Sequence, residues 1–124
     1  MTARILIIDD DEQLASAYRE YLITRGHEVD CAQELEEAQT LLAHFPYSVV
    51  VTDLRLTRLG FGGFDLIKYI RELSLSTRIV VFTGYGWPEV TAEVSAQHVD
   101  AFLHKPTRLA EMADVVGTLT GAPR

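Results

Sequence analysis

Hydrophobic residues in this sequence gather in five short runs that are separated by polar or helix-period segments. Four of these runs are continuous, and β-branched residues dominate the first three: Ile5–Ile8, Val49–Val51, Ile79–Phe82 and Ala101–Leu103. Continuous apolar runs are typical of strands that are covered on both faces, as in a parallel sheet. A weaker run at Glu28–Cys31 alternates apolar and polar residues, which favours an edge strand.

Segments with helical periodicity lie between these runs. Apolar residues recur at spacings of three and four within Glu12–Arg25, Glu34–His44 and Phe64–Leu73. In the first of these segments, the predicted apolar face consists of Leu14, Ala17, Tyr18, Tyr21 and Leu22. Gly26 is expected to end that helix in a left-handed conformation.

Two further helices are predicted near the C-terminal end. One spans Pro88–Gln97, because proline is tolerated in the first turn of a helix. The other follows Thr107, which is expected to cap it. The predicted buried residues of this last helix are Leu109, Met112, Ala113 and Val116.

The predicted order is strand then helix, repeated five times with short connections. Such alternation favours the α/β class, with a doubly wound parallel sheet of five strands and five helices on its two faces. A length of 124 residues gives room for one domain. We expect a single domain over 1–124, with its core at about 4–119 and no effector domain.

Composition narrows the setting in which the chain works. Cys31 is the only cysteine, so no internal disulfide forms and a reducing cytoplasm fits best. The apolar runs are far shorter than a membrane span and no leader precedes the first strand, so we expect a cytoplasmic protein without membrane contact. Eighteen acidic and eleven basic residues give a net charge of -7, which disfavours direct binding of nucleic acid.

Polar residues that could bind a ligand or take part in a reaction follow four of the predicted strands. Asp9, Asp10 and Asp11 follow the first strand and Asp53 follows the third, whereas Thr83 ends the fourth and Lys105 with Pro106 follows the fifth. The carboxyl ends of parallel strands meet at one edge, where ligands bind. Each residue alone is compatible with an ordinary cap or loop position, but their combination favours one shared pocket.

Three neighbouring carboxylates would raise one another's pKa values unless a cation lay among them. Mg²⁺ prefers such carboxylate oxygens together with water and phosphate oxygens, while Mn²⁺ and Ca²⁺ accept the same ligand types. A carboxylate is also a nucleophile toward phosphorus and forms an aspartyl phosphate. That transfer depends on alignment and charge neutralisation, which Mg²⁺, Lys105 and the Thr83 hydroxyl would supply.

Four blocks of the sequence carry a resemblance to a known family. These blocks are Ile5–Glu12, Val49–Leu54, Val80–Gly84 and Asp100–Pro106. In this order and spacing, the chain resembles the receiver domain of two-component response regulators from Arg4 to about Leu119. The resemblance implies a flavodoxin-like sheet with the strand order 2-1-3-4-5. It also implies signalling by phosphorelay, without turnover of a free substrate.

The resemblance assigns roles to the residues of the pocket. Asp53 would be the phosphoacceptor, and Asp10 and Asp53 would ligate Mg²⁺ directly. Asp9 would hold the ion through water, and the backbone carbonyl of Arg55 would be a further ligand. The remaining implied roles are phosphoryl pairing by Lys105, a cis bond before Pro106, and a conformational switch formed by Thr83 and Phe102. Asp11 is expected to begin the first helix and not to bind the metal.

The same resemblance implies the partners. The phosphoryl donor would be a histidine kinase or a histidine phosphotransfer protein, docking near Leu14, Ala15 and Tyr18. The output partner stays open, as does the choice between a monomer and a phosphorylation-dependent dimer. Whether the domain acts alone or belongs to a longer protein also stays open.

One segment departs from the family pattern, and two other functions compete with the receiver interpretation. Thr57 replaces a common proline, and the segment Arg58–Gly63 is about two residues longer than usual. A pseudoreceiver that binds partners without phosphorylation is one alternative. Against it stands the complete set of residues that the family uses for phosphorylation: Asp9, Asp10, Asp53, Thr83 and Lys105. An aspartyl phosphatase or flavin protein is the other, and Gln13 stands where such a phosphatase has threonine. His27, His44, His98 and His104 have no convincing metal-ligand spacing.

Overall fold

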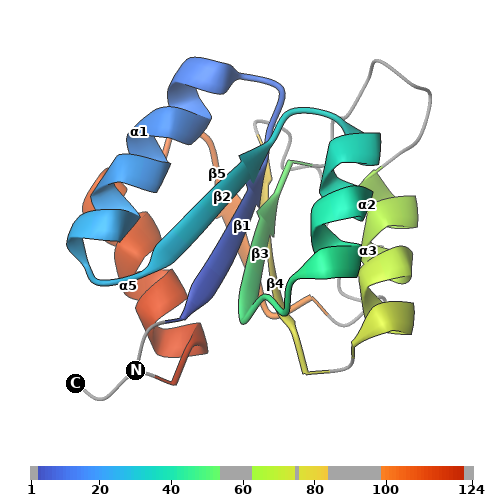
Figure 1. Ribbon diagram of the computed structural model, residues 1–124. Helices are drawn as coiled ribbons and strands as arrows, with labels where there is room; N and C mark the ends of the chain where they lie inside the picture. The colour runs from blue at the N-terminus through green and yellow to red at the C-terminus, as the bar shows by residue number, and fades with distance from the viewer. Residues whose placement is uncertain (1–2, 54–62, 75, 84–98, 122–124) are drawn as a thin grey trace.

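The computed structural model describes residues 3–53, 63–74, 76–83 and 99–121. Strands and helices alternate along these segments (Figure 1). Their bounds are β1 Arg4–Ile8, α1 Glu12–Thr24, β2 Glu28–Ala32, α2 Leu35–His44, β3 Val49–Thr52, α3 Gly63–Leu73, β4 Arg78–Thr83, β5 Ala101–His104 and α5 Leu109–Leu119. The helix predicted at Pro88–Gln97 and the long segment after Asp53 lie outside the described residues.

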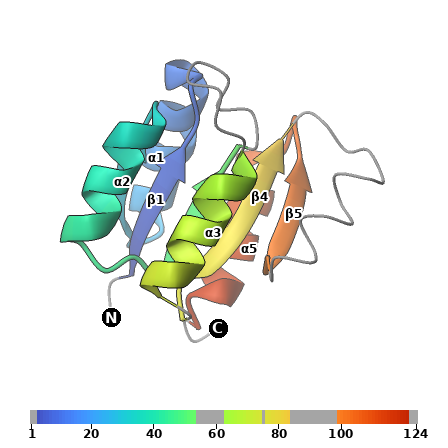
Figure 2. The same ribbon diagram turned by 90° about the vertical axis from the view of Figure 1, so that its right-hand side faces the viewer.

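The five strands form one parallel sheet in the order β2-β1-β3-β4-β5. In Figure 2 the arrows of β1, β4 and β5 point the same way. This order confirms the prediction, including the edge position of β2. Ile5 of β1 is aligned with Val29 on one side and with Val49 on the other. All carboxyl ends therefore lie along one edge of the sheet, which is the upper edge in Figure 1.

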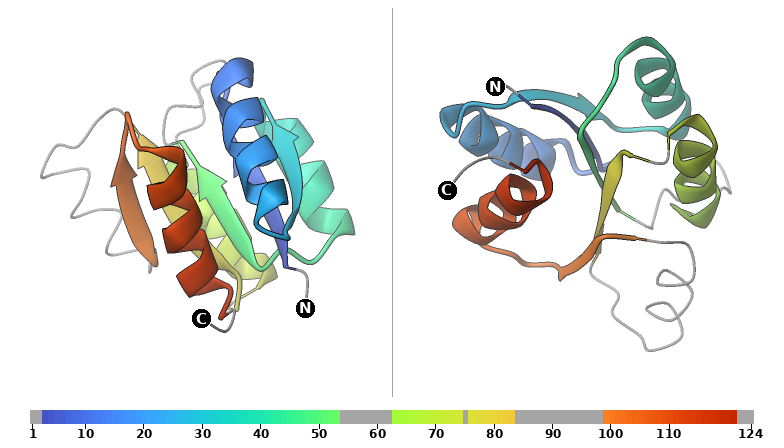
Figure 3. Two further views of the ribbon diagram at one scale, coloured as in Figure 1. Left: turned by 90° about the vertical axis from the view of Figure 1, so that its left-hand side faces the viewer. Right: turned by 90° about the horizontal axis from the view of Figure 1, so that it is seen from below.

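Helices cover both faces of the sheet, as expected for a doubly wound fold. α1 and α5 lie side by side on one face, and α2 and α3 cover the other (Figures 1 and 3). Successive side chains of β1 point to opposite faces, so Ile5 and Ile7 pack toward α1 and α5 whereas Leu6 and Ile8 pack toward α2 and α3. Because both faces are buried, the strand has the continuous apolar sequence that predicted it.

The ends of α1 follow the predicted chemistry. Asp11 is the N-cap, and its carboxylate accepts a hydrogen bond from the backbone N–H of Leu14. Gly26 has a φ of 93°, a left-handed conformation that glycine adopts without a steric penalty. The predicted apolar face is only partly correct, because Ala17 is exposed whereas Ala15 is buried.

Two predictions about α5 are wrong. The N-cap of this helix is Arg108 and not Thr107, because the Thr107 hydroxyl instead donates to the backbone carbonyl of His104. Leu109 is 38% exposed and not buried, because it lies in the first turn, ahead of the residues that reach the sheet. The other three predicted core residues, Met112, Ala113 and Val116, are buried.

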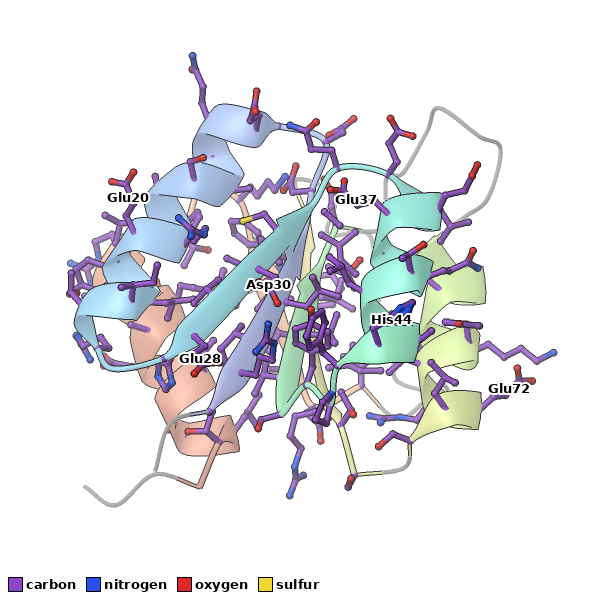
Figure 4. The ribbon with its side chains drawn as sticks, viewed as in Figure 1. Glu20, Glu28, Asp30, Glu37, His44 and Glu72 are labelled. Carbon is purple, nitrogen blue, oxygen red and sulfur yellow. The ribbon has the colours of Figure 1, made fainter. Side chains whose placement is uncertain are left out.

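A polar network closes the opposite edge of the sheet, where the strands begin. The Arg4 guanidinium donates to Glu28 at 2.9 Å and to Asp30 at 3.1 Å. Tyr47 donates its hydroxyl to the same Asp30 carboxylate at 2.7 Å. Figure 4 labels Glu28 and Asp30 on β2. This network ties the start of β1 to β2 and to the residues that precede β3.

A second network holds the start of β5. The Asp100 carboxylate accepts hydrogen bonds from Arg71 of α3, from Arg78, and from the backbone N–H of Ile79 at 2.8 Å.

Among the described residues, no helix has the length and hydrophobicity that a membrane crossing requires.

Candidate functional site

The carboxyl edge of the sheet brings four of the predicted residues together. Asp9 and Asp10 follow β1, Asp53 follows β3, and Lys105 follows β5. Asp9 and Asp53 are 1% and 6% exposed, whereas Asp10 is exposed to solvent. One carboxylate oxygen from each of the three aspartates lies within 4.8 Å of the others. The predicted pocket is therefore a compact acidic cluster.

The backbone fixes the two buried carboxylates. The N–H of Asp9 donates to the carbonyl of Ala32, and the N–H of Asp53 donates to the carbonyl of Ile8, both at 3.0 Å. These bonds continue the sheet one step beyond the strands, so both residues leave the sheet at the same level. Asp9 Oδ1 also accepts the backbone N–H of Asp11 at 2.9 Å.

Lys105 bridges the two buried carboxylates. Its Nζ lies 2.6 Å from Asp9 Oδ2 and 2.9 Å from Asp53 Oδ2. Burial alone would lower the pKa of Lys105, but its hydrogen bonds to Asp9 and Asp53 outweigh burial and raise the pKa above its usual range. Burial raises the pKa of Asp9, and the hydrogen bond from Lys105 offsets part of that rise. The ammonium therefore stays charged and neutralises part of the acidic cluster.

The loop that carries Lys105 is fixed by several contacts. The Lys105–Pro106 bond is cis, as the resemblance implies. Tyr18 of α1 donates its hydroxyl to the carbonyl of Thr107. The Lys105 ammonium also lies 5.1 Å from the centre of the Phe82 ring, a cation–π contact. Sequence reasoning missed the contacts of Tyr18 and Phe82, because nothing in the spacing of these residues signals them.

The donor set of the cluster fits a hard divalent cation. Three carboxylates supply only oxygen ligands, and the exposed side of Asp10 leaves room for water, which suits Mg²⁺. No nitrogen or sulfur ligand belongs to this cluster among the described residues. Arg55, the expected carbonyl ligand, lies outside the part of the chain that the structure describes.

The two predicted switch residues lie on neighbouring strands. Thr83 ends β4 and is aligned with His104 of β5, although its side chain is outside the described part. Phe102 is partly buried and packs against the core under α2 and α3. Its ring centre lies 5.0 Å from that of His104.

The predicted docking residues need a correction. Ala15 and Tyr18 are each 3% exposed and pack in the core, so they offer little surface to a partner, although Tyr18 contributes to the lining of the groove described next. Leu14 is partly buried and lines a groove of about 600 Å³ between α1 and the loop before α5. This apolar groove passes beside Lys105, and its other surface residues include Ala17, Pro106, Arg108 and Leu109.

Comparisons with known proteins agree with this geometry. The sequence model of the response regulator receiver domain matches residues 5–117. The response regulator protein FleR of Pseudomonas aeruginosa is 28% identical over 94% of this chain. The photosynthetic apparatus regulatory protein RegA of Cereibacter sphaeroides is 32% identical over 87% of it. The chain spans 24% of the length of FleR and 58% of the length of RegA.

A solved structure shows the same likeness in three dimensions. A response regulator protein from Burkholderia pseudomallei, solved with a phosphorylated aspartic acid, a calcium ion and citrate, is 27% identical. The match covers 96% of this chain and 69% of that one, with a TM-score of 0.85.

Proposed function

This chain belongs to the response regulator receiver domain family, a family of signalling modules in two-component systems, and we propose that it accepts a phosphoryl group onto Asp53 in a Mg²⁺-dependent reaction. The observation that carries the proposal is the arrangement of charges. Asp53 lies among Asp9 and Asp10 with Lys105 in direct contact, so a nucleophile, a set of metal ligands and a cation share one pocket. The phosphorylated aspartic acid of the Burkholderia protein supports the same assignment.

The transfer needs few protein groups. An oxygen of the Asp53 carboxylate forms a bond to the phosphorus of a phosphohistidine, while the bond between phosphorus and the imidazole nitrogen breaks. The electron pair of that bond stays on the nitrogen of the donor. Lys105 keeps its proton, and its ammonium pairs with a phosphoryl oxygen and holds the group in line.

Asp10 and Asp53 would hold Mg²⁺ directly, Asp9 would hold it through water, and the carbonyl of Arg55 would complete the protein ligands. When bound, the ion neutralises charge on the phosphoryl oxygens. The calcium ion of the Burkholderia structure is consistent with a site made of oxygen ligands, which Mn²⁺ also accepts.

The donor is proposed to be a histidine kinase or a histidine phosphotransfer protein. Its docking surface would be the apolar groove beside Lys105, with Leu14 at one side and Pro106 at the other. A donor histidine placed there would lie beside Lys105, which contacts Asp53. After transfer, the Thr83 hydroxyl would bind the phosphoryl group and the Phe102 ring would turn inward, which changes the output surface.

The proposed setting is the cytoplasm, without membrane contact or direct binding of nucleic acid. Figure 4 labels Glu20, Glu37 and Glu72 on α1, α2 and α3, so acidic side chains are spread over several helices. A surface of this sign repels phosphate backbones. We propose that 1–124 forms one domain, and that the output partner is a protein or an attached domain.

Intact mass spectrometry after incubation with acetyl phosphate and Mg²⁺ tests the proposal. We expect the protein to gain one phosphoryl group, and we expect no gain with EDTA or in Asp53→Ala. An equal gain in Asp53→Ala would contradict the assignment of Asp53. No gain by the native protein under any of these conditions would favour a pseudoreceiver.

A further inference from the structure

Tyr18 connects helix α1 with the loop that carries Lys105. The residue is 3% exposed, and its hydroxyl donates to the carbonyl of Thr107, the second residue after Lys105. The two partners are 89 positions apart in the sequence, so the bond joins distant parts of the chain. Burial raises the pKa of the Tyr18 hydroxyl, which therefore keeps its proton at neutral pH and remains a donor.

The ring of Tyr18 reaches the same lysine by a second route. The ring makes a T-shaped contact with Phe82, with the ring centres 5.1 Å apart and an angle of 80° between their planes. The Lys105 ammonium lies 5.1 Å from the centre of that Phe82 ring. Tyr18 thus acts on the backbone of the lysine loop through Thr107 and on the surroundings of the ammonium through Phe82.

The loop gains an external anchor from this contact. The Thr107 hydroxyl donates to the backbone carbonyl of His104, the last residue of β5, so this contact ties the loop only to the strand that it directly follows. The bond from Tyr18 comes from α1, which is packed on the sheet by Ala15 and Leu22. A lysine stem has several rotatable bonds, so its ammonium keeps one position only where the surrounding structure, including the loop backbone, holds it.

We propose that Tyr18 is a positioning residue for Lys105, holding the loop between β5 and α5 so that the ammonium bridges Asp9 and Asp53. This inference rests on the proposed function for its consequence in phosphoryl transfer. The positioning itself is a property of the resting protein and is measurable without phosphorylation.

The test compares two substitutions that each remove one buried tyrosine hydroxyl. Tyr18→Phe keeps the ring on Phe82 and removes the bond to Thr107. Tyr47→Phe is the matched control, because Tyr47 is also buried but bonds to Asp30 and belongs to the core on the other face of the sheet. Tyr18→Leu removes the ring as well.

Nuclear magnetic resonance of the lysine ammonium groups is the first readout. Lys68 and Lys105 are the only two lysines in the sequence, and Lys68 is exposed. Ammonium protons that are held by two carboxylates exchange slowly with water, so we expect a signal from Lys105 in the native protein, identified by its loss in Lys105→Met. In Tyr18→Phe that signal should broaden or shift, whereas Tyr47→Phe should leave it in place.

The rate of phosphorylation by acetyl phosphate is the second readout. We expect Tyr18→Phe to lower the limiting rate about fivefold, with a larger loss in Tyr18→Leu. The Mg²⁺ concentration for half-maximal rate should stay within about twofold of the native value, because the aspartates are unchanged. Tyr47→Phe should react at the native rate.

The outcomes separate the two proposals. An unchanged Lys105 signal in Tyr18→Phe, or an equal change in Tyr47→Phe, would overturn the positioning role. A native protein that gains no phosphoryl group would count against the proposed function, and the ammonium signals would still decide the role of Tyr18.

Discussion

Replacing Lys105 with methionine removes the one described cation that bridges two buried carboxylates. Methionine keeps an unbranched apolar side chain of similar length, while the charge and its cation–π contact with Phe82 are lost. Asp9 and Asp53 then face each other without the ammonium that lay 2.6 and 2.9 Å from them. We expect Lys105→Met to be less stable than the native protein at neutral pH in the absence of divalent cations.

The size of the loss follows from burial. Removing one partner of a fully buried ion pair costs about 3–5 kcal/mol. The Lys105 side chain is 21% exposed, so water screens part of the interaction. We therefore expect the free energy of unfolding to fall by about 2 kcal/mol.

The pH dependence has a definite sign. Burial raises the pKa of Asp9 above its ordinary value of 3.8, and loss of the lysine would raise it further. A carboxyl group with a raised pKa binds more protons in the native state, so stability falls as pH rises through that raised value. The deficit of the variant should be largest at neutral pH and should shrink as the pH falls toward the ordinary aspartate value.

Urea unfolding with EDTA, and again with saturating Mg²⁺, measures both effects. A cation that binds only the folded state adds about 2.7 kcal/mol at a hundredfold excess over its Kd, enough to bring the variant to the stability that the native protein has with EDTA. Equal stability of the two proteins with EDTA would refute the electrostatic argument. If saturating Mg²⁺ raised the free energy of unfolding of neither protein, the metal site at these carboxylates would be refuted.

Two further predictions concern residues away from the pocket. Asp100→Ala should lower the free energy of unfolding by about 2 kcal/mol, because the backbone N–H of Ile79 and the guanidinium of Arg71 lose an acceptor. A urea unfolding midpoint equal to that of the native protein would contradict this. Burial raises the pKa of Cys31 to about 11, so alkylation of Cys31 by iodoacetamide near pH 8 should be about a hundredfold slower than that of a free thiol. An alkylation rate equal to that of the urea-unfolded chain would contradict this prediction.

The strand pattern predicted the fold because its signal is strong. A continuous run such as Ile5–Ile8 requires cover on both faces, and the alternating run at Glu28 correctly indicated an edge. Parallel strands then carry Asp9, Asp53 and Lys105 to the same edge, since each follows the end of a strand. The proximity of these residues was therefore accessible from the sequence, although the bridging contact of the lysine was not.

The errors arose where tertiary contacts override local preference. Thr107 has the side chain of a typical cap, but its hydroxyl donates to the carbonyl of His104 at the end of β5. Ala15 and Tyr18 lie near the expected docking surface, yet the helix turns them into the core. The bonds of Tyr18 to Thr107 and of Tyr47 to Asp30 join segments far apart in the chain, and no local spacing announces them.

Because both faces of β1 are buried, its apolar residues alone do not determine the register of this strand against its neighbours. If the register of this strand shifted by one residue, Ile7 would occupy the position of Leu6 and each face would still be apolar. Burial of apolar side chains therefore gives little preference for the native register. The polar residues at the ends of the strand do penalise the shift, because Arg4 would lose Glu28 and Asp30. The same shift would carry Asp9 about 3.3 Å along the strand and turn it to the wrong side. The ion pairs of Arg4 at the start of β1 thus favour the register in which Asp9 at the other end lies in the acidic pocket.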